Sequence, residues 1–258
     1  MSDLFAARVR QLGEESYAIW PALYDPDRVG AMRAELERVY REAGAPTPYG
    51  VGVTWLGDGI EISSTGFVVH KLLGRSRTLH RDLLSREAVD LVRGVLGQDM
   101  HLEMVAGVVC DHTRPFFEWH MHVGGIDDEL YRRQGLLPRF ERAERISMIV
   151  YLDEMDEHSG QLLVLPRKIT DPMTPPQPIA SRAWDGQIAV RGPAGTAVFM
   201  EQSTWHAVLP RNHASPRMFV GFWFAAAHAT QAERTDETLR ELGDVDEVLA
   251  SVLPRGAR

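Results

Sequence analysis

The chain has 258 residues, 44% hydrophobic and 25% charged, so we expect a globular protein and exclude a disordered, collagen-like or coiled-coil chain. Acidic residues outnumber basic ones by 36 to 28, and the resulting net charge of −8 gives no general electrostatic reason to expect a nucleic-acid partner. The single cysteine, Cys110, excludes an intramolecular disulfide. No signal peptide or membrane-length apolar run is present, which favours a cytoplasmic protein.

The first hundred residues predict helices together with a few short strands. Residues 16–24 are typical of an apolar strand. Asp25 can cap a helix and Pro26 suits its first position, so a helix over 26–43 is expected. Its apolar face consists of Val29, Met32, Leu36, Val39 and Tyr40. Two segments follow, a glycine-rich stretch with β-like pieces and a pair of short helices: 47–75 and 76–98.

From about residue 101 the chain changes to short runs of β-branched and aromatic residues separated by turn residues, a pattern typical of a β-sandwich or barrel. The predicted strands are 101–110, 145–152, 161–165, 186–192, 195–200 and 217–225. Two long interruptions, 123–144 and 171–185, are candidates for loops that line a site. We expect one domain over 1–258, divided into an N-terminal helical segment, a β core and a C-terminal helix: 1–100, 101–228 and 229–258.

Three of the ten histidines stand out. His120 and His122 alternate, and on a strand residues i and i+2 point to the same side, so both imidazoles would face one point. His206 follows a β run 86 residues later and is a candidate third ligand. Three protein ligands with open positions are a common basis for metal catalysis. A His-x-His pair alone is also compatible with ordinary surface or packed histidines.

The order of these motifs resembles the phytanoyl-CoA dioxygenase-like family of iron(II)- and 2-oxoglutarate-dependent oxygenases. The resembling pieces are the strand and helix from Tyr17 to residue 43, the segment 91–97, the sequence WHMH at 119–122, the strand and acidic turn at 147–153, the GQLLVLP stretch at 160–166, and the run from Gly195 to His206. Arg217, 11 residues past His206, falls where the family has its 2-oxoglutarate arginine.

This resemblance implies a mainly β protein with flanking helices and a double-stranded β-helix (jelly-roll) core. It implies Fe(II) bound by His120, His122 and His206, with 2-oxoglutarate as cosubstrate held by Arg217. An arginine suits this task because its planar fork binds a carboxylate through two hydrogen bonds. The partners would be O₂ and a small-molecule substrate, with no nucleic acid and no membrane. A strand-end arginine can also be merely solvent-exposed.

Position 122 departs from the family, which has Asp or Glu there. Either His122 itself is a ligand, or Asp127 (or Asp128) from the following GGIDDE segment supplies the carboxylate, or the metal site is altered or lost. Two other functions therefore stay open: a three-histidine metal enzyme that does not use 2-oxoglutarate, and a non-catalytic binding protein on the same fold.

Three further residues belong to the same region. His112 and Arg114 lie a turn before the His-x-His pair and are expected near the mouth of the site. Arg167 stands in a stretch where the family usually has Pro-Gly-Ser-His, and the sequence gives it no role.

Overall fold

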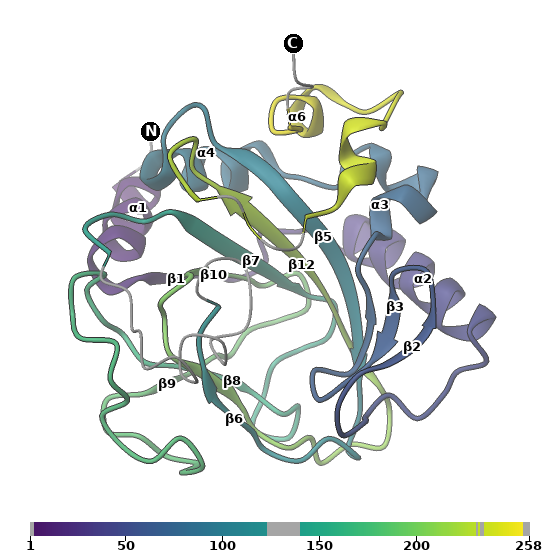
Figure 1. Cartoon of the computed structure of the whole chain (residues 1–258), viewed down its shortest axis with the longest axis horizontal. Helices are drawn as coiled ribbons and strands as arrows, with labels where there is room; N and C mark the ends of the chain where they lie inside the picture. Colours follow the sequence, from purple (N-terminus) through teal and green to yellow (C-terminus); the bar gives the residue numbers. More distant parts are fainter. Residues whose placement is uncertain (1–2, 123–139, 231, 233–234, 255–258) are drawn as a thin grey trace.

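Two antiparallel sheets face each other in the computed structural model, which describes residues 3–122, 140–230, 232 and 235–254. Helices cover the outer side of the larger sheet, and the smaller sheet lies on its other side (Figure 1). We call the space between the two sheets the barrel interior.

The larger sheet has eight strands in the order β1-β10-β7-β12-β5-β4-β3-β2. In chain order they are β1 (Tyr17–Trp20), β2 (Thr54–Gly57), β3 (Ile60–Ile62), β4 (Phe67–Val69), β5 (His101–Cys110), β7 (Arg145–Tyr151), β10 (Ala197–Glu201) and β12 (Arg217–Ala225). The long central strands β5, β12 and β7 agree closely with the predicted runs 101–110, 217–225 and 145–152.

The smaller sheet has four strands in the order β6-β11-β8-β9. They are β6 (Phe117–His120), β8 (Leu162–Val164), β9 (Ile188–Ala189) and β11 (His206–Val208). All are short, because most residues around them belong to the loops that join the two sheets.

The helices are α1 (Asp3–Glu15), α2 (Pro26–Glu42), α3 (Leu72–Arg75), the 3₁₀ helix η1 (Arg77–His80) and α4 (Arg86–Leu96). As expected, α2 begins after Asp25, whose carboxylate accepts a hydrogen bond from the backbone N–H of Arg28, and Pro26 occupies its first turn. The apolar faces of α2 and α4 pack on the outer face of the larger sheet and form the main core.

Side chains alternate across each strand, and the alternation separates the main core from the barrel interior. On β12, Val220 and Phe222 pack under the helices, whereas Phe219 faces the interior together with Tyr151 of β7 and Val108 of β5. A third cluster, which includes Trp119 and Trp205, packs outside the smaller sheet.

The segment expectations need two corrections. The single helix predicted for 229–258 is wrong, because the described part of this segment contains two short helices, η3 (Glu237–Arg240) and α6 (Glu247–Ala250). Asp244 between them has a φ of +54°, which a continuing helix does not allow. Segment 1–100 is also more than helical, since β1 to β4 extend both edges of the larger sheet.

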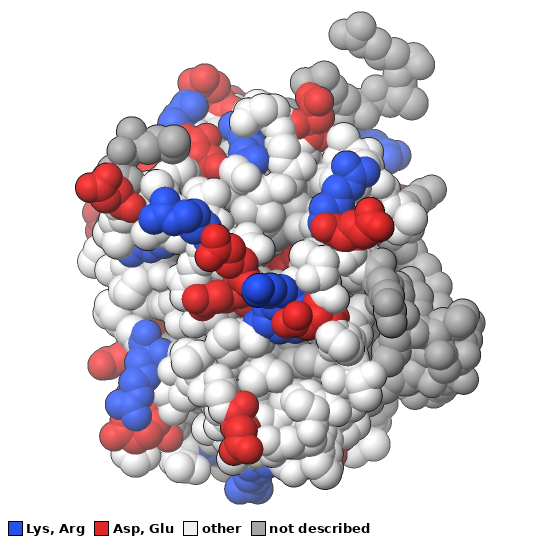
Figure 2. Space-filling model, turned by 90° about the vertical axis from the view of Figure 1, so that its left-hand side faces the viewer, with Lys and Arg blue, Asp and Glu red and all other residues white. Residues whose placement is uncertain are grey.

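No helix among the described residues is long and apolar enough to cross a membrane. On the face shown in Figure 2, acidic and basic side chains are interspersed and do not gather into one basic field.

Candidate metal centre

β6 and β11 bring two of the predicted histidines face to face. These strands pair antiparallel, with His206 directly opposite His120, and their imidazole centroids are 4.1 Å apart. The register shifts next to this pair, because Val208 lies opposite Phe117, so that three steps along β6 match two along β11. This bulge lets both Phe117 and His120 face the barrel interior.

His122 reaches the same point without lying on the strand. β6 ends at His120, so the expectation that one strand carries both residues does not hold. Instead the backbone N–H of His122 donates to the carbonyl oxygen of Gln202, at 2.9 Å. One ring nitrogen from each of His120, His122 and His206 lies within 4.8 Å of the others. The structure therefore brings the three predicted histidines together.

Backbone carbonyls fix the orientation of two of the rings. Nδ1 of His120 lies 2.7 Å from the carbonyl oxygen of Glu118, and Nδ1 of His206 lies 2.9 Å from that of Thr204. A carbonyl oxygen can only accept, so Nδ1 carries the hydrogen in both residues and Nε2 keeps its lone pair. Holding the outer nitrogen in this way is how proteins orient histidines that bind metals.

The electrostatics of the cluster suit metal binding. Burial lowers the pKa of His122 to about 4. Burial, followed by the charge of His122, lowers the pKa of His206 to about 3. Both rings are therefore neutral at pH 7, which is the form that binds a metal ion. Asp127 and Asp128, the alternative ligands, lie outside the described residues.

The spacing of the nitrogens fits a common ion. Nε2 of His122 and Nε2 of His206 are 3.1 Å apart. Two nitrogens that each lie about 2.1 Å from one ion, at right angles, are about 3.0 Å apart. The same distance fits a hydrogen bond between the rings when no ion is bound. His122 and His206 thus present two nitrogens at the spacing of neighbouring ligands of one ion.

A buried polar turn supports His206 from behind. The carboxylate of Glu201 accepts a 2.8 Å hydrogen bond from the backbone N–H of Ser203 and another from its hydroxyl. Arg167 donates to the carbonyl and the hydroxyl oxygen of Ser203. The next residue, Thr204, provides the carbonyl that orients His206. Arg167, whose role is not evident from the sequence, therefore stabilises the turn that leads to the site.

Arg217 is buried in the barrel interior, so the solvent-exposed alternative for it is wrong. Its Nη1 donates to the carbonyl of Gly160, and its Nη2 lies 3.5 Å from the Cys110 sulfur. The guanidinium carbon lies 5.5 Å from the centroid of the Tyr151 ring and 5.9 Å from that of Phe219. Its Nε is buried without a hydrogen-bond partner. The edge formed by Nε and Nη2 is therefore not used by any protein oxygen in the described chain.

The two ends of the interior differ in character. Arg217 opens β12, and Trp223 lies near the other end, where it pairs with Ser147 of β7. At the same end of β7, the carbonyl of Arg145 accepts a hydrogen bond from the backbone N–H of Gln202. The carbonyl of Gln202 in turn holds His122. Half-buried apolar side chains mark this end of the interior: Met104, Ile149 and Trp223.

A cleft of about 260 Å³ reaches His120, one of the three clustered histidines. Arg114 and His120 both contribute to its wall, together with Tyr49, Ser64 and Phe117. Arg114 therefore lies near the mouth, as expected, although its side chain is only 3% exposed.

Two residues at the site went unrecognised or undervalued in the sequence. Gln202 is buried, and neither atom of its side-chain amide has a hydrogen-bond partner in the described chain. The signal that could have identified it is the uninterrupted polar run 201–204 between two apolar strands. The burial of Arg114 has no comparable signal, because it depends on the β2–β4 extension folding over it, where Thr65 contacts its guanidinium.

No known family's sequence profile matches the chain, and no curated protein matches it in sequence. Solved structures do match in fold. The non-heme alpha ketoglutarate dependent carbocyclase SnoK from nogalamycin biosynthesis has a TM-score of 0.66 at 19% identity, over 100% of this chain and 94% of SnoK. The epimerase SnoN in complex with Fe3+, alpha ketoglutarate and nogalamycin RO has a TM-score of 0.65 at 15% identity, over 98% and 96%. HygX from Streptomyces hygroscopicus, with nickel and 2-oxoglutarate bound, has a TM-score of 0.60 at 12% identity, over 88% of both chains.

The chain shares its fold with these solved structures, of which SnoN and SnoK are described as non-heme alpha ketoglutarate dependent enzymes. The predicted jelly-roll core, mainly β with flanking helices, is thereby confirmed. Two of these structures hold Fe3+ or nickel together with 2-oxoglutarate, and this chain has a three-histidine cluster that fits a metal ion.

Proposed function

We propose that this protein is a non-haem iron(II)/2-oxoglutarate-dependent oxygenase that hydroxylates or otherwise oxidises a small molecule, in the phytanoyl-CoA dioxygenase-like branch of these enzymes. The observation that carries this proposal is the convergence of three imidazoles on one point of the barrel interior. The buried Arg217, which opens β12 on the same interior surface, adds a site for a carboxylate.

In this proposal His120, His122 and His206 hold the metal, and Arg217 binds the distal carboxylate of 2-oxoglutarate. Iron bound there would supply the activation of O₂ that drives oxidation of the substrate. Arg217 presents its free Nε–Nη2 edge to the carboxylate as a two-donor fork. The aromatic rings of Tyr151 and Phe219 keep water from that contact, which strengthens it.

The substrate would enter from the opposite end, against the half-buried Trp223. SnoK and SnoN are named as a carbocyclase and an epimerase, so the fold itself does not determine the outcome of the oxidation. We propose a single-domain, cytoplasmic enzyme that acts on a small molecule and binds neither nucleic acid nor membranes.

Anaerobic titration of the protein with iron(II) and 2-oxoglutarate tests the proposal. The chelate is expected to give its weak visible charge-transfer band, with one equivalent of each component. His206→Ala removes one of the oriented nitrogens and should abolish the band. His112→Ala, which removes an exposed histidine outside the cluster, should leave it unchanged. If the wild-type protein gives no band and binds no 2-oxoglutarate, the proposed function is wrong.

The identity of the third ligand has its own test. If His122 is the ligand, His122→Ala weakens iron binding and Asp127→Asn does not. The reverse result assigns the third position to Asp127 instead.

A second candidate function follows if His122 supplies the third ligand nitrogen. With His122 as a ligand the metal site has no carboxylate among the described residues, and a three-histidine metal enzyme need not use 2-oxoglutarate. That function predicts metal-dependent turnover when 2-oxoglutarate is omitted, and an Arg217→Ala variant that stays active.

A further inference from the structure

Three buried arginines lie near Cys110, at the end of the barrel interior where β12 begins: Arg114, Arg211 and Arg217. A guanidinium can bind a carboxylate through two parallel hydrogen bonds from its side edge, which is formed by Nε and Nη2. The three residues differ in what occupies that edge.

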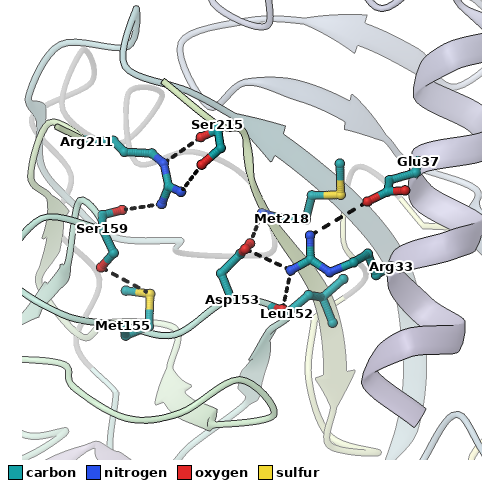
Figure 3. Close-up of polar contacts among 9 residues, drawn as sticks. All are labelled: Arg33, Glu37, Leu152, Asp153, Met155, Ser159, Arg211, Ser215 and Met218. Carbon is teal, nitrogen blue, oxygen red and sulfur yellow. Dashed lines mark hydrogen bonds and ion pairs between the residues drawn. The ribbon is translucent and has the colours of Figure 1, made fainter. Parts of the chain in front are cut away.

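The side edge of Arg211 is fully used by the protein. Nε donates to the carbonyl of Ser215 at 2.7 Å, Nη2 to its hydroxyl at 3.0 Å, and Nη1 to the carbonyl of Ser159 at 3.3 Å (Figure 3). Arg211 therefore stabilises the loop before β12, and its Nε–Nη2 edge is not available to a ligand.

Arg114 and Arg217 keep the same edge free. Arg217 uses Nη1 for the carbonyls of Ser159 and Gly160, and its Nη2 meets only the weak acceptor Cys110. Within the described residues the guanidinium of Arg114 makes one hydrogen bond, from Nη1 to the carbonyl of Thr65 at 3.3 Å. In both residues Nε is buried without a partner.

Within the described chain, neither Arg114 nor Arg217 forms an ion pair with a carboxylate. Asp153, whose charge acts on Arg217, is already bound by Arg33 at 2.8 Å and by the backbone N–H of Met218 at 2.7 Å (Figure 3). Asp111, whose charge acts on Arg114, accepts hydrogen bonds from the backbone N–H and the hydroxyl of Thr113. Buried charges without a counter-ion are costly, and proteins retain them where a ligand supplies the opposite charge. Arg114 and Arg217 therefore provide two buried positive charges that an anionic ligand would offset.

Arg114 and Arg217 both lie near Cys110. Burial alone would raise the pKa of the Cys110 thiol, but the charges of Arg114, Arg217 and Arg211 and a hydrogen bond from Arg217 bring it below its ordinary value. Cys110 is the last residue of β5 and pairs with Arg217. Arg114 and His120 line one cleft, so a ligand held at the histidines can extend to Arg114.

We propose that Arg114 is a second guanidinium of the cosubstrate site and binds, together with Arg217, the distal carboxylate of 2-oxoglutarate. This inference rests on the proposed function. It also accounts for the charge of the interior: a metal dication with three neutral ligands and two arginines carries four positive charges, and the cosubstrate dianion offsets two of them.

The test compares binding of two ligands to the anaerobic iron(II)-loaded protein by calorimetry and by the visible band. 2-Oxopentanoate has the metal-chelating end of 2-oxoglutarate and a methyl group in place of the distal carboxylate. We expect Arg114→Gln to raise the Kd of 2-oxoglutarate about tenfold to a hundredfold and to leave that of 2-oxopentanoate unchanged. Arg217→Gln should behave in the same way.

Arg211→Gln is the matched control, since it removes a buried guanidinium beside the same site whose donors face only protein oxygens. It should leave both Kd values unchanged. Arg114→Lys keeps the positive charge but loses the two-donor fork, so it should raise the Kd of 2-oxoglutarate less than Arg114→Gln does. It replaces Arg114→Gln as the test variant if that variant does not fold.

The outcomes separate this inference from the proposed function. If the wild-type protein binds no 2-oxoglutarate, the proposed function and this inference both fail. If it binds 2-oxoglutarate and Arg114→Gln binds it equally well, only the role of Arg114 is wrong. An equal loss for both ligands would assign Arg114 a structural role and overturn the inference as well.

Discussion

Glu201 makes the stability of this protein depend on pH in an unusual direction. Its side chain is 3% exposed, and one of its carboxylate oxygens has no hydrogen-bond partner in the described chain. Burial raises its pKa to about 7, although hydrogen bonds from Ser203 and the charge of Arg167 oppose the shift. An unfolded chain would ionise the same group near its ordinary value of 4.5.

The folded protein therefore holds this proton more tightly than the unfolded chain does. Below pH 4.5 the group is protonated in both states, and its contribution to stability is fully present. As the pH rises towards 7 the unfolded chain loses the proton first, and the contribution is lost. The difference of about 2.5 pKa units corresponds to about 3 kcal/mol of unfolding free energy, most of it lost between pH 5 and 8.

Glu201→Gln removes the titration and preserves the acceptor oxygen for Ser203. Denaturant unfolding of the wild type, of Glu201→Gln and of an exposed control, Glu154→Gln, measured from pH 5 to pH 8, is the assay. The wild type and the control should lose about 2–3 kcal/mol more than Glu201→Gln as the pH rises. Parallel curves for all three proteins would refute the reasoning.

The remaining predictions concern stability and need only unfolding curves. Gly195→Ala should destabilise the fold by at least about 3 kcal/mol, because Gly195 has a φ of +85° and a Cβ there would lie 2.1 Å from the carbonyl oxygen of Tyr24; a change below 1 kcal/mol would show that the turn relaxes easily. Glu103→Met should cost about 3–5 kcal/mol, since it leaves Arg145 buried without the carboxylate now 2.8 Å from its Nε, and the double variant with Arg145→Met should recover part of the loss; no recovery contradicts an ion-pair origin. Ser85→Ala should cost about 1 kcal/mol, because the Ser85 hydroxyl caps α4, and an unchanged midpoint would mean that water replaces the cap.

Much of the larger sheet could be predicted from the sequence because its strands are long and apolar. The runs 101–110 and 217–225 became β5 and β12 with the same bounds, and Asp25 and Pro26 set the start of α2. In such segments burial follows composition directly.

The smaller sheet was much harder to predict. β6 and β11 have four and three residues, include histidines, and pair across 86 residues of sequence. Their pairing is a tertiary effect that local pattern does not encode. The tail failed for a related reason: its Glu, Asp and Leu pattern suits a helix, but Asp236 and Asp246 cap two separate short ones.

The three histidines could be singled out because alternation and motif order are visible in the sequence. The edge that a buried arginine leaves unused is not visible there, since it depends on which carbonyls the fold places nearby. The sequence does not distinguish the three arginines from one another. Only their hydrogen-bond partners separate Arg211, which stabilises a loop, from Arg114 and Arg217, which keep donors free.

The bulge in β6 shows where the length of this strand can change without moving a ligand. If Glu118 were deleted, Phe117 would stand two positions before His120, and regular alternation would keep both side chains on the interior face. Val208 and His206 would then keep Phe117 and His120 as their partners across the strand pair. The exposed position Glu118 is thus a point at which relatives of this chain, or an engineer, could lengthen or shorten β6 by one residue and keep the wall beside the histidines.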